Sequence, residues 1–313
     1  MSSRLSSEQT KAEAKSLGFF ACGLAKAAPV SHECATTFNR WLANKGHAGM
    51  DYMERNTDKR LDPTMLVSGV KTIICVALNY APSRRMPEGG LQLASYALGK
   101  DYHDIVKSRL HALAYRLGIT EYRAFCDTAP VLERYWAVQA GLGWTGRNHQ
   151  LVIPHSGTMF FLGELFVSNE TDEYDAPVKP RCGTCDACIK ACPTGALSHD
   201  GTFCSSKCLS YLTIENRGDI PTEFAGKMGN TIYGCDRCQD ACPWNRFATP
   251  TDDPQLKPPM ELLDMTRADW QQLSVERYRT LFKGSAVKRA KYEGLMRNIR
   301  AVTSNKDNSR NNL

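Results

Sequence analysis

The chain has 313 residues, of which 42% are hydrophobic and 23% charged, so it is long and apolar enough for two globular domains and is not a disordered or fibrous protein. No run approaches the roughly 18 apolar residues of a membrane span, and the polar N-terminus MSSRLSSEQTKAEAK lacks the apolar core of a signal peptide. With a modest net charge of +6, these features predict a cytoplasmic protein that does not contact a membrane and whose thiols stay reduced.

In chain order, the first 170 residues alternate between helical and strand patterns. We predict strands over residues 19–24, 71–80, 122–127, 150–154 and 158–168, and helices over 7–17, 33–45, 101–117 and 131–141, with a short helix after Pro63. This alternation indicates a layered α/β or α+β domain, although it does not fix the strand order.

Proline-bearing segments near 170–180 and at 249–259 indicate linkers on either side of a cysteine-rich unit. They predict an α/β domain over 1–170, a cysteine-rich domain over 171–250 and a helical, basic segment over 251–313. Between residues 277 and 310, ten Lys or Arg residues accompany two acids, a local charge of about +8. A solvated helix face is the usual explanation of such a run. A phosphate-bearing partner is the alternative, because the excess is dense and of one sign.

Seven cysteines of the middle part follow two spacings. The first run is Cys182-x-x-Cys185-x-x-Cys188-x-x-x-Cys192-Pro193, the bacterial ferredoxin pattern in which three thiolates bind one cluster and the fourth binds the other. The second run, Cys235-x-x-Cys238-x-x-x-Cys242-Pro243, lacks its first ligand because Ile232 stands there, and either Cys204 or Cys208 could replace it. Zinc is the alternative for paired cysteines, but the repeated run before proline favours two [4Fe–4S] clusters.

Two other patterns resemble cofactor motifs only as strings. Gly141-x-Gly143-x-x-Gly146 matches a dinucleotide fingerprint, but a helix precedes it and a strand follows, so we interpret it as a helix stop and turn. Asp101-x-His103 begins a D-x-H-x-x-G corrinoid motif that lacks its glycine, and we interpret His103 as a helix-surface or packing residue.

Asp127 and Arg60 each have two interpretations. Asp127 follows a predicted strand and precedes a helix, so it either faces a ligand crevice at the strand end or caps the helix. Arg60, within DKRLDP, is either an exposed charge or an anchor for an anionic group.

Four strings, DTAPVLERYWAVQAGLGWTGRN, CGTCDACIKACPTGAL, KCLSYLTIENRG and IYGCDRCQDACPWN, closely resemble the epoxyqueuosine reductase family, and the resemblance covers about residues 10–300. That family is cobalamin-dependent, performs the last step of queuosine formation at the wobble position of tRNA and is related to the reductive dehalogenases. The resemblance implies an α+β protein: a nitroreductase-like α/β cobalamin-binding domain, a bacterial-ferredoxin-like 2[4Fe–4S] domain and a short helical basic tail. We expect a monomer that takes electrons from an external low-potential donor.

The resemblance also implies site residues. One cluster is assigned to Cys182, Cys185, Cys188 and Cys242, and the other, nearer the corrinoid, to Cys192, Cys208, Cys235 and Cys238. Cys208 is preferred to Cys204 because it occupies the cysteine of the family's C-[LI]-S-[YF]-L-T motif. Asp127 matches the family's proton donor, and the expected cobalamin contacts are Arg60, Asp127, Leu151, Leu162, Ser210 and Asp236. No histidine is expected to bind the cobalt.

The implied reaction removes an epoxide oxygen and leaves an alkene. Electrons would pass from the clusters to cobalamin, and Asp127 would protonate the departing oxygen, for which we expect burial to raise its pKa. The substrate would be a tRNA anticodon loop carrying epoxyqueuosine, held in part by Lys288, Arg289 and Lys291. Two alternatives stay open: a corrinoid iron–sulfur reductase of a small molecule, similar to a dehalogenase, and a non-catalytic electron-transfer ferredoxin module.

Overall fold

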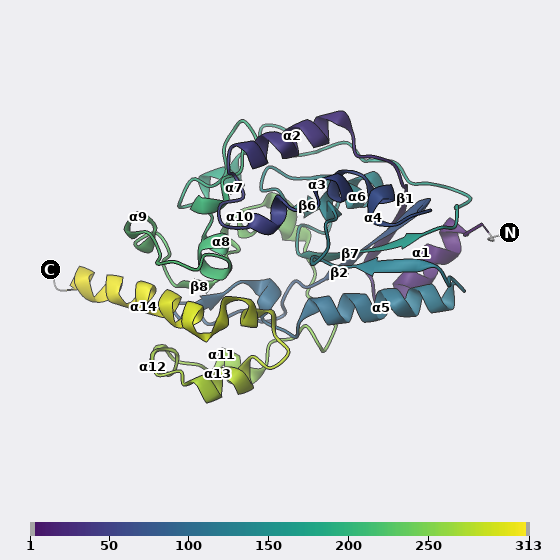
Figure 1. Cartoon of the computed structure of the whole chain (residues 1–313). Helices are drawn as coiled ribbons and strands as arrows, with labels where there is room; N and C mark the ends of the chain where they lie inside the picture. Colours follow the sequence, from purple (N-terminus) through teal and green to yellow (C-terminus); the bar gives the residue numbers. More distant parts are fainter. Residues whose placement is uncertain (1–3, 311–313) are drawn as a thin grey trace.

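The computed structural model describes residues 4–310, and their side chains up to residue 304. At its centre is a four-stranded sheet in the order β1-β2-β7-β4, formed by Ala21–Lys26, Thr72–Asn79, Phe160–Val167 and Tyr122–Phe125 (Figure 1). Each neighbouring pair in this sheet is antiparallel. The rule that places a ligand crevice at the carboxyl ends of parallel strands therefore does not apply here.

Helices cover both faces of this sheet, because its central strands are apolar on both sides. On β2, Ile74 and Val76 pack into the core beneath α1 and α5, whereas Ile73 and Cys75 pack on the opposite side with α6. This alternation is the two-residue period of a strand. The helices concerned are α1 (Ser7–Ser16), α5 (Tyr102–Arg116) and α6 (Glu133–Gln139). The other elements of this part are α2 (His32–Ala43), η1 (Asp51–Met53), α3 (Thr57–Leu61), α4 (Pro63–Leu66), β3 (Gln92–Leu93), η2 (Ser95–Ala97), β5 (Trp144–Thr145) and β6 (Leu151–Val152).

The helix α5 lies close against β7 because position 163 is a glycine. A Cβ atom at Gly163 would collide with the side chain of Val106, and it would also crowd Leu110. This close approach fixes the height of α5 above the sheet, and with it the position of the first helical turn, which carries Tyr102 and His103.

A third core joins the cysteine-rich part to the C-terminal helices. Its buried side chains come from residues 86–98, 209–233 and 262–302. Asn298 of α14 links the two parts, because its Nδ2 donates hydrogen bonds to the carbonyl oxygens of Thr213 and Ile232, each at 2.8 Å. The elements here are α7 (Ala187–Lys190), η3 (Ser205–Lys207), α8 (Leu209–Ile214), α9 (Thr222–Ala225), β8 (Thr231–Tyr233), α10 (Arg237–Asp240), η4 (Pro243–Phe247), α11 (Met260–Leu263), α12 (Arg267–Gln271), α13 (Val275–Leu281), η5 (Ala286–Ala290) and α14 (Lys291–Arg310).

The predicted helices and strands of the first 170 residues are confirmed, with ends displaced by a few residues. The molecule is a mixed α/β protein, and the division at residues 170 and 250 stays a prediction. The glycine-rich string is confirmed as a helix stop: α6 ends at Gln139, Gly141 takes φ +71°, and β5 follows.

Candidate functional site

A cavity of about 2380 Å³ lies between the sheet and the cysteine-rich part. Its walls include α2, the start of α6, residues 192–238 and the basic element η5. The volume exceeds the roughly 300–1,000 Å³ of pockets for drug-sized ligands. The cavity therefore has room for a large cofactor together with part of a substrate.

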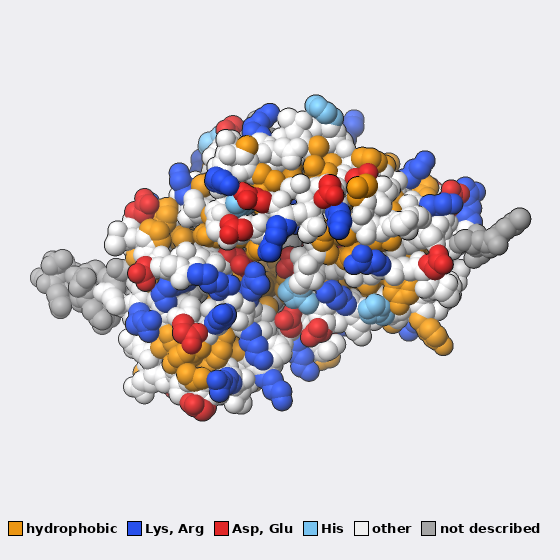
Figure 2. Space-filling model, in the orientation of Figure 1, with side chains coloured by type: hydrophobic (Ala, Val, Ile, Leu, Met, Phe, Trp, Pro, Cys, Tyr) orange, Lys and Arg blue, Asp and Glu red, His pale blue; other side chains and the backbone are white. Residues whose placement is uncertain are grey.

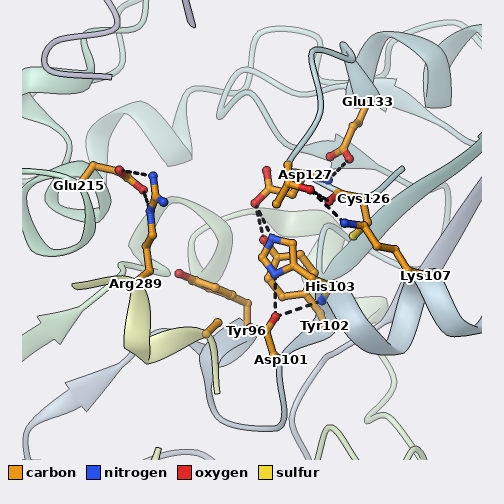
Figure 3. Close-up of polar contacts among 12 residues, drawn as sticks. Tyr96, Asp101, Tyr102, His103, Lys107, Cys126, Asp127, Glu133, Glu215 and Arg289 are labelled. Atoms are coloured by element: carbon orange, nitrogen blue, oxygen red, sulfur yellow. Dashed lines mark hydrogen bonds and ion pairs between the residues drawn. The ribbon is translucent and has the colours of Figure 1, made fainter. Parts of the chain in front are cut away.

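Asp127 lies on the wall of this cavity, in the loop after β4. Tyr102 Oη donates to Asp127 Oδ2 at 2.6 Å, and His103 Nε2 lies 3.3 Å from the same oxygen. His103 Nδ1 in turn lies 2.6 Å from Asp101 Oδ1. The imidazole is therefore held between two carboxylates, as Figure 3 shows.

These contacts determine whether His103 or Asp127 carries a proton at neutral pH. Burial acts to lower the pKa of His103, but its hydrogen bonds to Asp101 and Asp127 outweigh burial and raise the pKa to about 9. Partial desolvation by the surrounding cavity walls acts to raise the pKa of Asp127, but hydrogen bonds from His103 and Tyr102 leave that pKa below its ordinary value. The expected rise in the pKa of Asp127 is therefore wrong for the open cavity, where 58% of the side chain is exposed. At neutral pH the proton is on His103.

Asp127 does not cap the following helix. The N-cap of α6 is Leu132, and no side chain caps this helix. Instead, the Asp127 backbone N–H donates to Glu133 Oε1. Burial, reinforced by the charge of Asp127, raises the pKa of Glu133 to about 8. In the same loop, Thr128 Oγ1 accepts a hydrogen bond from Lys107 Nζ at 3.0 Å.

Arg60 faces the same cavity but is itself buried. Its residue is 7% exposed, and its Nε has no hydrogen-bond partner among the described residues. A terminal nitrogen lies 3.5 Å from the Tyr52 carbonyl oxygen, and burial lowers the pKa of the guanidinium. A buried cation without a carboxylate is poorly compensated, so the interpretation of Arg60 as an exposed charge is wrong. The position suits an anionic group.

The other residues predicted to contact cobalamin line this cavity too. They are Leu151, Leu162, Ser210 and Asp236. Asp236 accepts the Ser95 backbone N–H at 2.6 Å, and burial raises the pKa of its carboxyl group.

The structure brings the eight predicted cluster cysteines together as two groups. The inner group lines the cavity and consists of Cys192, Cys208, Cys235 and Cys238. Burial raises the pKa of the Cys238 thiol, and Cys235, Cys208, Cys192 and the adjoining Cys188 act in the same direction, as neighbouring thiols do. Cys204 also faces the cavity, but its Sγ lies 3.2 Å from Ser206 Oγ.

The outer group lies away from the cavity lining and consists of Cys182, Cys185, Cys188 and Cys242. Burial raises the pKa of Cys242, and the neighbouring Cys182 and Cys185 raise it further. Burial likewise raises the pKa of Cys188, with Cys242 and Cys182 nearby.

A zinc site and a cubane cluster require different separations of the cysteine sulfurs. Sulfurs that are each about 2.3 Å from one zinc ion must also touch one another. In the part of the chain that the structure describes, no group of three or more His, Cys, Asp or Glu side chains is placed to hold a single ion. A cubane cluster binds each cysteine through a different iron, so its sulfur ligands lie farther apart.

The three predicted tRNA contacts lie at or near the cavity mouth. Lys288, Arg289 and Lys291 are exposed, and the first two line the cavity, whereas Lys291 does not. Arg289 forms a two-pronged ion pair with Glu215, at 2.8 and 2.9 Å, and Figure 3 shows this pair across from Asp127. Figure 2 shows further Lys and Arg side chains around the hollow on this face.

Tyr102 and His103 were not predicted as site residues. His103, predicted as a helix-surface or packing residue, stacks on Tyr102 but also contacts two carboxylates at the cavity wall. Both residues lie in the first turn of α5, about 25 positions before Asp127 in the chain. Their approach to Asp127 depends on α5 packing across β7 and on β4 pairing with β7. The available signal was the partial corrinoid string that begins at Asp101 and includes His103.

No helix in the described range is both long enough and apolar enough to cross a membrane. The cytoplasmic location and the monomeric state stay predictions.

Comparison with known proteins gives two family matches. Residues 60–128 match the family described as epoxyqueuosine reductase QueG, DUF1730, and residues 181–245 match the 4Fe-4S double cluster binding domain. The chain is 44% identical to an epoxyqueuosine reductase of Cellulophaga algicola, over 94% of this chain and 96% of that protein. It is 40% identical to one of Pseudomonas aeruginosa, over 91% of this chain and 81% of that protein.

Two solved structures of epoxyqueuosine reductases share the fold. One, from Bacillus subtilis, has an aspartate-bearing catalytic loop swung out of its active site; it gives a TM-score of 0.87 at 28% identity, over 96% of this chain and 82% of that one. The other was solved with an epoxyqueuosine-modified tRNA stem loop and gives a TM-score of 0.85 at 28% identity, with the same coverage of 96% and 82%.

Proposed function

Because this chain belongs to the epoxyqueuosine reductase family, we propose that it reduces epoxyqueuosine to queuosine at the wobble position of tRNA. The observation that carries the proposal is one large cavity with Asp127 on its wall and the four inner cysteines also in its lining. The cavity thus offers a proton-transfer group and an electron source to the same volume. A ferredoxin module alone would not need such a cavity.

The cysteine groups would hold the two [4Fe–4S] clusters, the outer group one cluster and the inner group the other. Cobalamin fits the cavity on two observations. One is the volume, and the other is the buried Arg60, whose Nε has no hydrogen-bond partner among the described residues and which suits the phosphate of the cofactor's nucleotide tail. The contacts would be Arg60, Asp127, Leu151, Leu162, Ser210 and Asp236. When bound, cobalamin supplies the low-potential electron chemistry that side chains cannot provide.

The protein's own side chains would manage the protons. Removing an epoxide oxygen as water, with an alkene left behind, consumes two electrons and two protons. One proton would pass through Asp127, and the second would come from solvent. Substrate that fills the cavity takes water away from Asp127 and so favours its neutral form. A proton then moves from His103 Nε2 to Asp127 Oδ2, and Asp127 donates it to the departing oxygen, while the Tyr102 hydroxyl orients the carboxyl group. The aspartate-bearing catalytic loop of the Bacillus subtilis relative supports this role for Asp127.

The tRNA would bind over the basic mouth of the cavity. The relative solved with a modified tRNA stem loop supports a tRNA substrate. Lys288, Arg289 and Lys291 would contact phosphates, which orients the loop without reading its sequence. The modified base would leave the loop stack and enter the cavity at a cost of a few kcal/mol.

Nucleoside analysis tests this function. tRNA carrying epoxyqueuosine is incubated without oxygen with the cluster-loaded protein and reduced methyl viologen, with and without cobalamin. We expect queuosine to replace epoxyqueuosine only when cobalamin is present. Unchanged epoxyqueuosine in the presence of a fully loaded protein would contradict the proposal.

A further inference from the structure

The outer cysteine group reaches the protein surface on a side that does not line the cavity. Cys185 is exposed, and so are Arg181, Gly183 and Thr184 of the same loop, around a half-buried Cys182. The inner cysteines instead line the cavity that the substrate would occupy. A cluster on the outer group is therefore the one that an external electron donor can approach.

Aromatic side chains lead from Cys182 to the surface. Trp144 Nε1 donates to Cys182 Sγ at 3.4 Å, and the Trp244 ring packs edge-on against Trp144 with centroids 4.9 Å apart. His155 and Phe247 extend this group, with ring centroids 5.8 and 6.0 Å from that of Trp244. His155 is exposed, so the group ends in solvent.

Three arginines border the aromatic group. Arg147 Nη2 donates to the Gly183 carbonyl oxygen at 3.0 Å, Arg181 directly precedes Cys182, and the Arg246 guanidinium lies 4.6 Å from the Phe247 ring centroid. None of the three forms an ion pair with a carboxylate whose side chain the structure describes.

The nearby acids on α7 and α10 are already neutralised. Asp186, at the start of α7, pairs with Lys190 at 3.0 Å, and Asp240 of α10 pairs with Arg85 at 2.6 Å. The two helices are in contact and lie side by side in Figure 1. The three arginines therefore give this surface an uncompensated positive charge.

We infer that this surface, formed by Arg147, Arg181, Arg246, His155 and Phe247, docks a small acidic electron-carrier protein. The inference rests on the proposed function, because only a reductase that consumes electrons needs such a donor. An aromatic centre with an arginine border has the composition of protein interfaces. Weak electron-transfer complexes are small, and opposite charge mainly accelerates their association.

The test measures electron entry separately from tRNA chemistry. Arg181→Glu and Arg246→Glu are combined in one variant, since both side chains are exposed. A control variant combines Lys15→Glu and Lys26→Glu, which change the net charge equally on the exposed surface of α1 and β1. The probe is a reduced acidic [2Fe–2S] ferredoxin, and stopped-flow absorbance follows the reduction of the clusters in the cobalamin-loaded protein.

We expect the second-order rate constant for cluster reduction by ferredoxin to fall about tenfold or more in the arginine variant at low ionic strength. The difference between this variant and the wild type should be smaller in 0.5 M salt. The lysine control should match the wild type. If the arginine variant loses iron, Arg181→Gln with Arg246→Gln is used, with a smaller loss of rate expected. Equal rates in arginine and lysine variants would overturn the inference, as would weaker tRNA binding with unchanged cluster reduction. Failure of queuosine formation with methyl viologen would count only against the proposed function.

Discussion

Asp127 adopts φ +58°, a left-handed backbone conformation that few side chains accept. Aspartate and asparagine are the non-glycine residues that enter this region most readily, because their short polar side chains bond locally. Asp127→Asn therefore keeps the loop conformation and removes the capacity to carry a proton, together with the negative charge that helps to raise the pKa of His103. This makes asparagine a better probe than alanine at this position.

We expect Asp127→Asn to slow queuosine formation by about 10²–10⁴-fold, the usual contribution of general acid catalysis, with little change in tRNA affinity. Asp104→Asn, on the exposed side of α5, is the matched control and should be neutral. Single-turnover assays with the two variants separate the outcomes. An Asp127→Asn rate within about twofold of the wild type would remove Asp127 from the proton path.

The state of His103 predicts the alkaline limb of the pH profile. A histidine whose pKa is raised keeps its proton up to the folded value, here about 9. The value of kcat/KM, which reports the free enzyme, should therefore fall as pH rises through about 9. The ion pairs of His103 also increase the free energy of unfolding. This contribution is complete below the ordinary histidine pKa of about 6.5 and is lost as pH rises through the folded value of about 9.

His103→Gln tests this assignment, because glutamine can retain a hydrogen bond but does not titrate. The variant should be slow and should lack the alkaline limb that the wild type shows. Asp101, Asp127 and Tyr102 are the titratable groups that contact the imidazole. An unchanged limb in the variant would show that His103 is not its source.

At the scale of elements, the periodic patterns predicted α5, β4 and β7 correctly because each pattern is set by local burial. The antiparallel order of the sheet could not be predicted, since it depends on how distant strands pair. For the same reason the contact of Tyr102 and His103 with Asp127 could not be predicted. Gly163, which lets α5 approach β7, has no distinctive pattern in the sequence.

The short element η3 and the start of α8 decide which cysteine completes the inner cluster. Burial is the main cause of the raised pKa values of Cys235 and Cys238, and the neighbouring Cys208 raises both further. Cys204 instead contacts Ser206. We expect Cys208→Ala to lose about half of the eight irons of two [4Fe–4S] clusters, and Cys204→Ala to retain them. Iron analysis of both variants, purified without oxygen, measures this. The reverse pattern would move the ligand to Cys204.

The basic element η5 and the start of α14 provide a second test at this scale. Arg289 is already paired with Glu215, so Lys288→Gln with Lys291→Gln is the better probe of phosphate contacts. We expect a higher KM for tRNA and a salt dependence shallower by about 0.7 in log–log slope for each lost single-strand contact. Lys15→Gln, on the exposed surface of α1, is the control. A slope equal to that of the wild type would exclude these lysines from the interface.

At the scale of the whole molecule, the two cysteine runs could be assigned from the sequence because ligand spacing is local chemistry. The cavity could not, because its walls come from segments that meet only in the folded chain. Arg60 shows the difference: the sequence allowed an exposed charge or an anion anchor, and its burial excludes the exposed charge, while the role of anchor stays a prediction. The core that unites residues 86–98, 209–233 and 262–302 was equally unforeseen.

The central claim is that one cavity places cobalamin between the inner cluster and Asp127. Electron paramagnetic resonance of the cluster-loaded protein with cob(II)alamin tests it most directly, because nearby spins broaden each other's signals. Partial reduction of the clusters should broaden the cob(II)alamin signal, and Cys208→Ala should remove this broadening. A cob(II)alamin signal identical to that of the free cofactor, in protein with all eight irons, would contradict the account.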